Sequence, residues 1–335
     1  MIPNEIRREV EELRERILQY QREYYIEGRP SVSDREYDRL FDRLLELENR
    51  FPELKTPDSP THRVGSDLDS DFPEVRHTVP VLSLDKAYSP EEVFSWMEKV
   101  SQSVGRPLSF VLEEKIDGVS IVLYYREGYL YQAVTRGNGY VGNDVTPNVK
   151  TIRQVPLRVS KKEPFFVRGE IYLPVAQFEA LNATMDPPYA NPRNLVGGTL
   201  RRKKSRETAR IPLQLFVYDG FLESSPPEHW LVIEELKTLG FPINPRNVFI
   251  PSTGVNLSEI RRLVDRFSRE RKDLPYQIDG LVFKVNELGV RDALGYTEHH
   301  PRWAIAYKFE APYGASRVKK IEIQVGRTGR ITPVA

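Results

Sequence analysis

The segment Lys115-Ile116-Asp117-Gly118 holds the residues of this chain that are best suited to covalent chemistry. It lies between two predicted strands and follows Glu113 and Glu114. A lysine at the end of a strand acts as a nucleophile when burial or neighbouring cations favour its free amine. A polar turn is the more frequent explanation of an isolated K-x-D-G string. The segment alone therefore predicts either a turn or a nucleophilic lysine.

Candidate partners for that lysine lie far along the chain. They are Arg136, Glu170 in V-R-G-E, Lys284 in D-G-L-V-F-K, and Lys308 in W-A-I-A-Y-K. Basic residues on separate strands suit a polyphosphate, because their charges would neutralise it. This pattern favours phosphoryl or nucleotidyl chemistry.

A second motif suggests a different class of enzyme. Residues 137–142 spell G-x-G-x-x-G, which in a βαβ unit binds a dinucleotide and would indicate a nicotinamide dehydrogenase. Here the preceding strands are predicted to form a hairpin, and Pro147 and Pro156 interrupt the segment after the motif. We therefore interpret the motif as a glycine-rich turn.

The amino-terminal segment is predicted to be a helical hairpin. Apolar residues from Ile6 to Tyr24 recur at helical spacing, and Gly28 comes next as a stop. Ser33 and Glu36 form a capping box that opens a second helix, which continues until Pro52. The stretch 51–80 is rich in Pro, Ser, Thr and Asp, and predicts a long loop that contains the first domain boundary.

The rest of the chain is predicted to be rich in short strands. A turn at Arg126-Glu127-Gly128 joins neighbouring strands closely, so the sheets are expected to be mainly antiparallel and the fold class α+β. A short helix is expected to open at Ser89, others near 230–239 and 257–271, and a strand pair within 318–334. The predicted strands are Phe110 to Glu114, Val119 to Tyr125, Leu130 to Thr135, Phe165 to Tyr172, Leu213 to Tyr218 and Leu281 to Val285.

Length and composition exclude several classes of protein. The 335 residues suggest two domains and the start of a third, and 39% hydrophobic with 29% charged residues indicates an ordinary globular chain. The absence of cysteine rules out a disulfide framework, a thiol nucleophile and a cysteine-based zinc site in this sequence. No run of 18 apolar residues and no export signal are found, so we expect no membrane contact and a cytoplasmic location.

Taken together, the motifs resemble those of the bacterial NAD⁺-dependent DNA ligases and, more widely, the nucleotidyltransferase superfamily of ATP-dependent ligases and mRNA capping enzymes. K-x-D-G is followed in family order by T-R-G, V-R-G-E, N-P-R-N, D-G-L-V-F-K-V, P-R-W-A-I-A-Y-K-F and V-G-R-T-G. The resemblance implies a helical domain at 1–68 that recognises the nicotinamide mononucleotide half of NAD⁺. It implies an adenylation (nucleotidyltransferase, ATP-grasp-like ligase) domain at 69–317, and the beginning of an OB-fold at 318–335.

The resemblance also implies a mechanism. Lys115 would attack the α-phosphate of NAD⁺ and release nicotinamide mononucleotide, and the AMP would then pass to the 5′-phosphate of nicked DNA before the nick is closed. Lys284 and Lys308 would contact the phosphate, Asp117 would belong to the same catalytic segment, and Mg²⁺ would share the work. The ligands of the metal are not assigned.

The binding residues implied by the resemblance fall into three sets. Glu113 would meet the adenine end, with Ser83 and Leu84 in the same pocket, while Glu170 would meet the ribose and Arg136 would lie beside the nucleotide. For each residue, the alternative is a structural or solvated side chain. The mononucleotide site would be Tyr24, Tyr25, Asp34, Tyr37 and Asp38, and contacts with the DNA backbone or the active site would come from Arg193, Arg201 and Arg271.

Some positions depart from the family pattern and leave a divergent paralogue with weak joining activity as an alternative. They are Lys86, Asn138, Asn143, Gln277 and the stretch 196–199. The net charge is only +1, but the segments 193–210 and 302–335 are each strongly basic, so nicked double-stranded DNA is the expected partner. We expect a monomer with no evident protein partner, which adenylates itself but seals nicks poorly.

Overall fold

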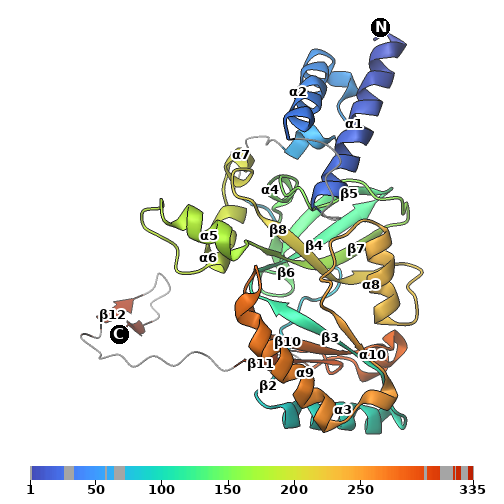
Figure 1. Cartoon of the computed structure of the whole chain (residues 1–335), viewed down its shortest axis with the longest axis vertical. Helices are drawn as coiled ribbons and strands as arrows, with labels where there is room; N and C mark the ends of the chain where they lie inside the picture. The colour runs from blue at the N-terminus through green and yellow to red at the C-terminus, as the bar shows by residue number, and fades with distance from the viewer. Residues whose placement is uncertain are drawn as a thin grey trace.

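The amino-terminal hairpin consists of helices α1 (Asn4–Tyr25) and α2 (Asp34–Arg50), which lie at one end of the computed structural model (Figure 1). The structure describes residues 2–25, 34–56, 59–63, 72–297, 300–309, 320, 322–325 and 331–334. The predicted helical periodicity is confirmed, because Val10 and Ile17 of α1 and Leu44 of α2 are fully buried in one cluster. Gly28 and Ser33 lie outside the described residues.

The stretch predicted as a loop contains short regular elements. Two 3-10 helices, η1 (Pro52–Leu54) and η2 (Pro60–Arg63), follow α2. Strand β1 (Glu74–Arg76) pairs antiparallel with β6 (Val141–Asn143). Pairing with a distant strand is a tertiary effect, which local composition does not reveal.

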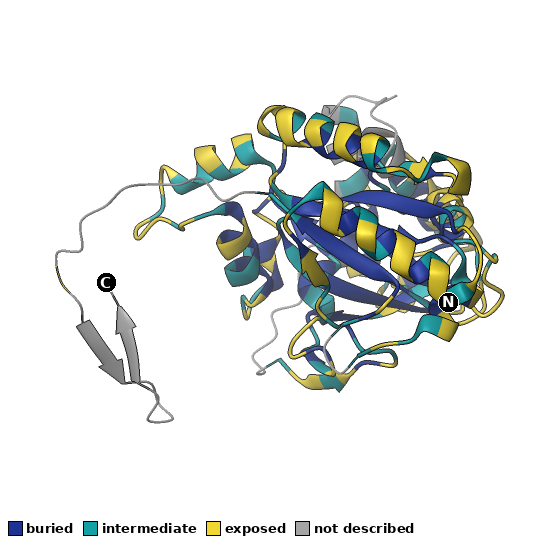
Figure 2. Ribbon diagram, turned by 90° about the horizontal axis from the view of Figure 1, so that it is seen from below, coloured by how far each residue is buried: buried dark blue, intermediate teal, exposed yellow. Residues whose placement is uncertain are grey.

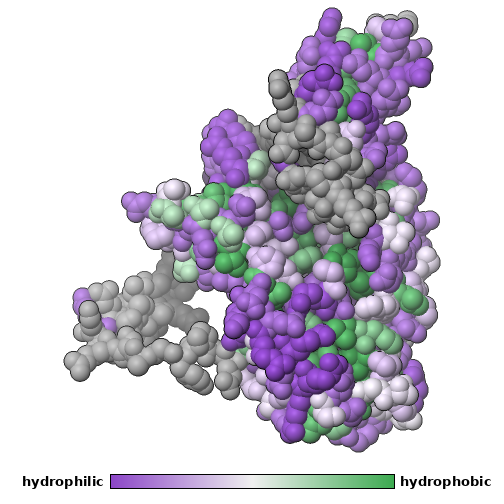
Figure 3. Space-filling model, viewed as in Figure 1, coloured by the Kyte–Doolittle hydropathy of each residue, from purple (hydrophilic) through white to green (hydrophobic). Residues whose placement is uncertain are grey.

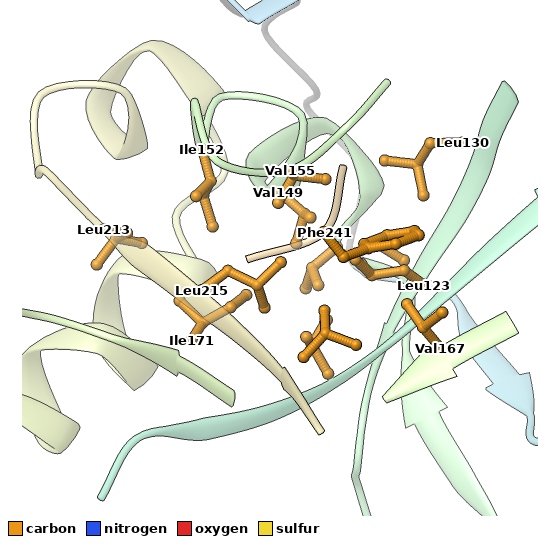
Figure 4. Packing of buried hydrophobic residues seen from close by; sticks show 14 of the residues in the cluster. Leu123, Leu130, Val149, Ile152, Val155, Val167, Ile171, Leu213, Leu215 and Phe241 are labelled. Atoms are coloured by element: carbon orange, nitrogen blue, oxygen red, sulfur yellow. The ribbon is translucent and has the colours of Figure 1, made fainter. Parts of the chain in front are cut away.

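One sheet has the strand order β5-β4-β7-β8 and is antiparallel throughout. Its strands are β4 (Val119–Arg126), β5 (Tyr129–Thr135), β7 (Phe165–Tyr172) and β8 (Gln214–Phe221). Leu123, Val167 and Leu215 project from one face into the largest hydrophobic cluster, where they meet Val149 and Phe241 (Figure 4). Helix α8 (His229–Thr238) covers this face.

The second sheet has the order β2-β11-β10-β3-β9, in which only the pair β11 and β2 is parallel. Helices α3 (Pro90–Val104) and α9 (Leu257–Glu270) cover one face, and α9 presents a hydrophilic surface outward (Figure 3). The strands of both sheets are largely buried, whereas the helices alternate between buried and exposed residues (Figure 2). The strands are β2 (Asp85–Ala87), β3 (Phe110–Ile116), β9 (Val248–Ile250), β10 (Ile278–Val285) and β11 (Ala304–Lys308).

The α+β class with mainly antiparallel sheets is confirmed, and each predicted strand is present with ends within a few residues. The helix predicted at Ser89 is longer than expected, and Ser89 caps it by accepting a hydrogen bond from the N–H of Glu92. No helix in the described ranges is long and apolar enough to cross a membrane. The remaining elements are α4 (Thr146–Val149), α5 (Val175–Asn182), α6 (Pro192–Leu200), α7 (Ser205–Thr208), η3 (Ser252–Gly254), η4 (Arg271–Asp273), α10 (Leu288–Leu294), β12 (Glu322–Val325) and β13 (Ile331–Val334).

Candidate active site

The predicted nucleophile Lys115 lies in a row of paired residues across three strands. Gly280 of β10 pairs with Lys115 of β3 on one side and with Lys308 of β11 on the other. Directly paired residues place their side chains on the same face, so the two lysines flank a position without a side chain. A Cβ on Gly280 would lie 2.1 Å from the carbonyl oxygen of Tyr307, which explains the glycine.

A β-bulge brings a carboxylate between these two lysines. The register of β10 shifts between Ile278 and Gly280, so Asp279 is the extra residue, and bulges of this kind re-aim a side chain. Asp279 Oδ1 lies 3.0 Å from Lys115 Nζ, and Asp279 Oδ2 accepts a short hydrogen bond from Lys308 Nζ. Burial tends to raise the pKa of Asp279, but the two ammonium groups outweigh it and hold the pKa below its ordinary value.

Lys284 belongs to a second, more deeply buried group. Its Nζ lies 2.7 Å from Glu113 Oε2 and donates to the carbonyl oxygen of Tyr218 at 2.9 Å. Strand β8 has a bulge in which Tyr218 is the extra residue. Its neighbours Val217 and Asp219 pair with consecutive residues of β7. Glu113 Oε1 also lies 2.7 Å from His229 Nε2, and burial raises the pKa of Glu113 against the opposing effect of Lys284.

Lys115 and Lys308 of the first group, and Lys284 and Glu113 of the second, line a single cavity of about 760 Å³ between the sheets. This volume lies in the range of ligand sites. Arg136 reaches Ser83 Oγ at 3.3 Å on the cavity wall. Of the residues proposed from the sequence, the cavity is lined by Ser83, Leu84, Glu113, Lys115, Arg136, Glu170, Arg193, Arg201, Lys284 and Lys308.

The glycine of the K-x-D-G segment is required by close packing. A Cβ on Gly118 would lie 2.2 Å from the carbonyl oxygen of Ile171 in β7. Gly118 therefore lets β4 start directly against the strand that carries Glu170. Burial raises the pKa of Glu170 to about 8, and nearby Asp117 acts in the same direction. This shift favours the protonated form of Glu170 near neutral pH, and a protonated carboxyl can donate a hydrogen bond.

Two predicted site residues, Asp117 and Arg271, do not line the cavity. Asp117 is not among the lining residues, although its Oδ1 accepts from Arg193 at 3.1 Å. Arg271 also does not line the cavity, and its guanidinium stacks over Phe309 with 4.8 Å to the ring centroid. The side chains of Tyr24, Tyr25, Asp34, Tyr37 and Asp38 lie outside what the structure describes.

The glycine motif at 137–142 is a turn, as the sequence interpretation expected. It joins β5 to β6 rather than a strand to a helix, and in this part of the chain, which is fully described, no helix begins at Gly142. Asn138 Oδ1 accepts hydrogen bonds from the N–H groups of Tyr140 and Val141, which closes the turn. The structural context of a dinucleotide fingerprint is missing.

Sequence reasoning did not single out several residues of the site. Asp279 was visible only as the acid before Gly280, and its bulge is a property of strand pairing. His229 and Asp219 carried no sequence signal, because a lone histidine in an amphipathic helix is ordinary. No three acidic or histidine side chains among the described residues are grouped so that they could hold a metal ion.

Protein families and curated proteins match most of this chain. The family described as the NAD-dependent DNA ligase adenylation domain matches residues 69–312, and the DNA ligase-like, N-terminal NAD+-binding domain matches residues 3–65. The chain is 49% identical over 327 residues to a DNA ligase of Borrelia turicatae (strain 91E135), covering 96% of this chain and 48% of that protein. A DNA ligase of Borreliella afzelii (strain PKo) is 47% identical, with 99% and 50% covered.

Solved structures with similarity include a putative ATP-dependent DNA ligase from Aquifex aeolicus. It aligns with a TM-score of 0.38 and 14% identity, covering 72% of this chain and 55% of that one. An archaeal ATP-dependent RNA ligase also has a TM-score of 0.38, with 15% identity and 72% and 50% covered. The chain spans about half the length of the curated relatives it matches.

Proposed function

The chain belongs to the NAD-dependent DNA ligase family, and on that premise we propose that it transfers AMP from NAD⁺ to Lys115. The observation that carries this proposal is the row of Lys115, Gly280 and Lys308 with Asp279 between the lysines. A nucleophile and a second cation share one carboxylate at the wall of a cavity that is large enough for a nucleotide. This arrangement suits attack on a phosphate.

In the proposed reaction, the free amine of Lys115 attacks the phosphorus of the AMP half of NAD⁺. The new P–N bond forms as the P–O bond to nicotinamide mononucleotide breaks; the mononucleotide leaves with the bridging oxygen, and the nitrogen gives one proton to water. Lys308 would stabilise charge on the phosphate oxygens, and Arg136 would add to it. Asp279 would hold both lysines in place before the nucleotide binds.

The nucleobase would lie at the opposite group of the same cavity. The geometry separates Lys284 from Lys115 and pairs it with Glu113, so we assign Lys284 to the adenine end with Glu113 rather than to the phosphate. Ser83 and Leu84 would line the same end. Glu170, holding its proton at neutral pH, would donate to the ribose.

Mg²⁺ remains part of the proposal. Magnesium is usually held by one or two carboxylates together with phosphate oxygens. Asp117 would supply such a carboxylate, because its partner Arg193 is exposed and could release it. Bound there, the ion would neutralise charge on the phosphate. The residues present are compatible with such a shared site.

We further propose DNA as the acceptor of the AMP. Arg193 and Arg201 line the cavity mouth, and five further basic residues lie within 202–210. Such a patch fits backbone phosphates. Arg271 stays a proposed DNA contact outside the cavity. Tyr24, Tyr25, Asp34, Tyr37 and Asp38 would recognise the mononucleotide half, and β12 with β13 would open an OB-fold.

The experiment that tests this function is the intact mass of the chain after incubation with NAD⁺ and Mg²⁺. We expect a gain of one AMP and release of nicotinamide mononucleotide. We also expect weak sealing of nicked DNA, a monomer and a cytoplasmic location. A mass that stays unchanged under conditions where the chain is folded would refute the proposed function.

A further inference from the structure

His229 lies at the centre of a buried charged cluster behind the cavity. It begins α8, its side chain is 0% exposed, and its Nε2 lies 2.7 Å from Glu113 Oε1. Its Nδ1 faces Asp219 Oδ1 at 3.7 Å, which is too long for a hydrogen bond. Within the described residues, Nδ1 has no hydrogen-bond partner. The short contact with Glu113 is therefore the polar contact that fixes the ring.

The charges around His229 favour its neutral form. Lys284 from β10 and Arg291 from α10 offset Glu113 and Asp219, and Arg168 from β7 adds a positive charge near Asp219. A proton on His229 would add to an excess of positive charge inside the protein. Burial, together with Arg291 and Lys284, holds the pKa of His229 well below its ordinary value. Neutral His229 can therefore serve as a donor only through Nε2–H.

We propose that neutral His229 is a positioning residue: it donates its Nε2 proton to Glu113 and so keeps that carboxylate ionised and oriented for the nucleobase. The inference rests on the proposed function, because it concerns the end of the cavity that would take adenine. His229 itself is not among the residues that line the cavity. Its effect on a ligand would pass through Glu113.

The donor of Lys284 and the lone pairs of Glu113 that no group of the described residues uses determine which ligand atoms can bind there. Lys284 has three N–H donors, of which Glu113 and the carbonyl of Tyr218 take two, so one is left. Each Glu113 oxygen accepts from one protein group and has a second lone pair free. The pair thus offers a donor beside an acceptor. Adenine, with an acceptor at N1 and a donor at its amino group, matches this edge if Glu113 is ionised.

The test measures equilibrium binding of adenosine and inosine by calorimetry between about pH 5 and 8, where neither nucleoside changes charge. Inosine replaces the amino donor of adenosine by an acceptor and the N1 acceptor by an N1–H donor, so the preference for adenosine reports on the donor–acceptor edge formed by Lys284 and ionised Glu113. The variants are His229→Leu, which removes the donor, and His229→Gln, which retains an N–H donor. Val232→Ala, in the same helix and 1% exposed, is the matched control for lost packing.

We expect the native chain to prefer adenosine and to lose affinity on the acid side as Glu113 gains a proton. In His229→Leu, this loss should begin about one pH unit higher, because a carboxylate without its donor binds a proton more tightly. The preference for adenosine should fall about tenfold at neutral pH. His229→Gln should restore both properties, and Val232→Ala should lower Tm without changing either.

Native pH dependence and native preference in His229→Leu would overturn the inference. The inference would also be overturned if the pH dependence of nucleoside affinity shifted as far in His229→Gln as in His229→Leu. An equal shift in Val232→Ala would overturn it as well. A measurement on the native chain applies even if His229→Leu does not fold. Nitrogen-15 NMR should show His229 as the Nε2–H tautomer at neutral pH, and an imidazolium or the Nδ1–H tautomer would contradict us.

Failure of this inference can be told apart from failure of the proposed function. If the native chain gains AMP from NAD⁺ but the leucine variant keeps the native nucleoside preference, only the role of His229 is wrong. If no AMP is gained, the proposed function is wrong, whatever the nucleoside measurements show.

Discussion

Replacing Glu170 by glutamine should stabilise the chain at neutral and alkaline pH. Burial raises the pKa of this carboxyl to about 8 from 4.5, with Lys115 and Arg193 opposing the shift. The unfolded chain therefore loses the proton near pH 4.5, whereas the folded chain keeps it until about pH 8. Because the folded state binds the proton more tightly, the free energy of unfolding falls as pH rises between these values. Glutamine cannot ionise and avoids this loss.

The size of the effect can be worked out from the two pKa values of Glu170. Their difference corresponds to at most about 5 kcal/mol in the free energy of unfolding. Some of the Glu170 side chain remains accessible to water, which reduces the cost of ionising it in the folded state. We therefore expect a loss of about 2 to 3 kcal/mol in the free energy of unfolding at pH values above both pKa values. The advantage of Glu170→Gln over the native chain should be absent below about pH 4 and should grow steadily towards about pH 8.

Urea unfolding at a series of pH values measures this difference directly. The matched control is Glu163→Gln, which changes an exposed carboxylate just before β7, the strand that carries Glu170. Its free energy of unfolding should equal that of the native chain at every pH. A Glu170→Gln curve that runs parallel to the native curve would show that Glu170 is ionised in the folded protein. Its proposed role as a hydrogen-bond donor at neutral pH would then be wrong.

Three further predictions concern other parts of the structure. Gly118→Ala should lower the free energy of unfolding in urea by about 1 to 3 kcal/mol, because the new Cβ would lie 2.2 Å from the carbonyl oxygen of Ile171. The control is Gly289→Ala in α10, where the Cβ would enter open space, and it should be neutral or slightly stabilising. Arg193→Ala should weaken binding to nicked DNA and reduce the salt slope by about one, and an unchanged slope would contradict a phosphate contact. Labelled ATP should not transfer label to the chain, and removal of the residues before Pro52 should abolish reaction with NAD⁺. Equal labelling from ATP, or an unaffected rate after removal, would refute the role of the hairpin.

Much of the fold could be predicted because its signals are local. The period of apolar residues in α1 and α2, the cap at Ser89 and the turn at Glu127-Gly128 each depend on neighbours in sequence. Strands β1, β6 and β9 could not be predicted, because each is three residues long and is defined by a distant partner. The short helices α4 to α7 depend on tertiary contacts rather than on periodicity: α4 and α6 contact strands of the first sheet, whereas α5 and α7 contact neighbouring helices.

The candidate site shows the same division. The lysines at 115, 284 and 308 could be proposed from their motifs, yet their separation into two groups could not. That separation depends on the bulge at Asp279 and on the bulge at Tyr218, which arise when strands pair. His229 reaches Glu113 across 116 residues of sequence, so its role required the folded chain.

The site of AMP attachment after reaction with NAD⁺ tests directly whether Lys115 is the nucleophile. We predict that peptide mapping of the modified chain finds one AMP, bonded to Lys115, and that Lys115→Arg stays folded but gains no AMP. Arginine keeps the positive charge but supplies no free amine near neutral pH, so the variant separates a nucleophile from a phosphate clamp. An AMP on any other residue of the native chain, or an adduct formed by Lys115→Arg, would contradict the role of Lys115 as the nucleophile.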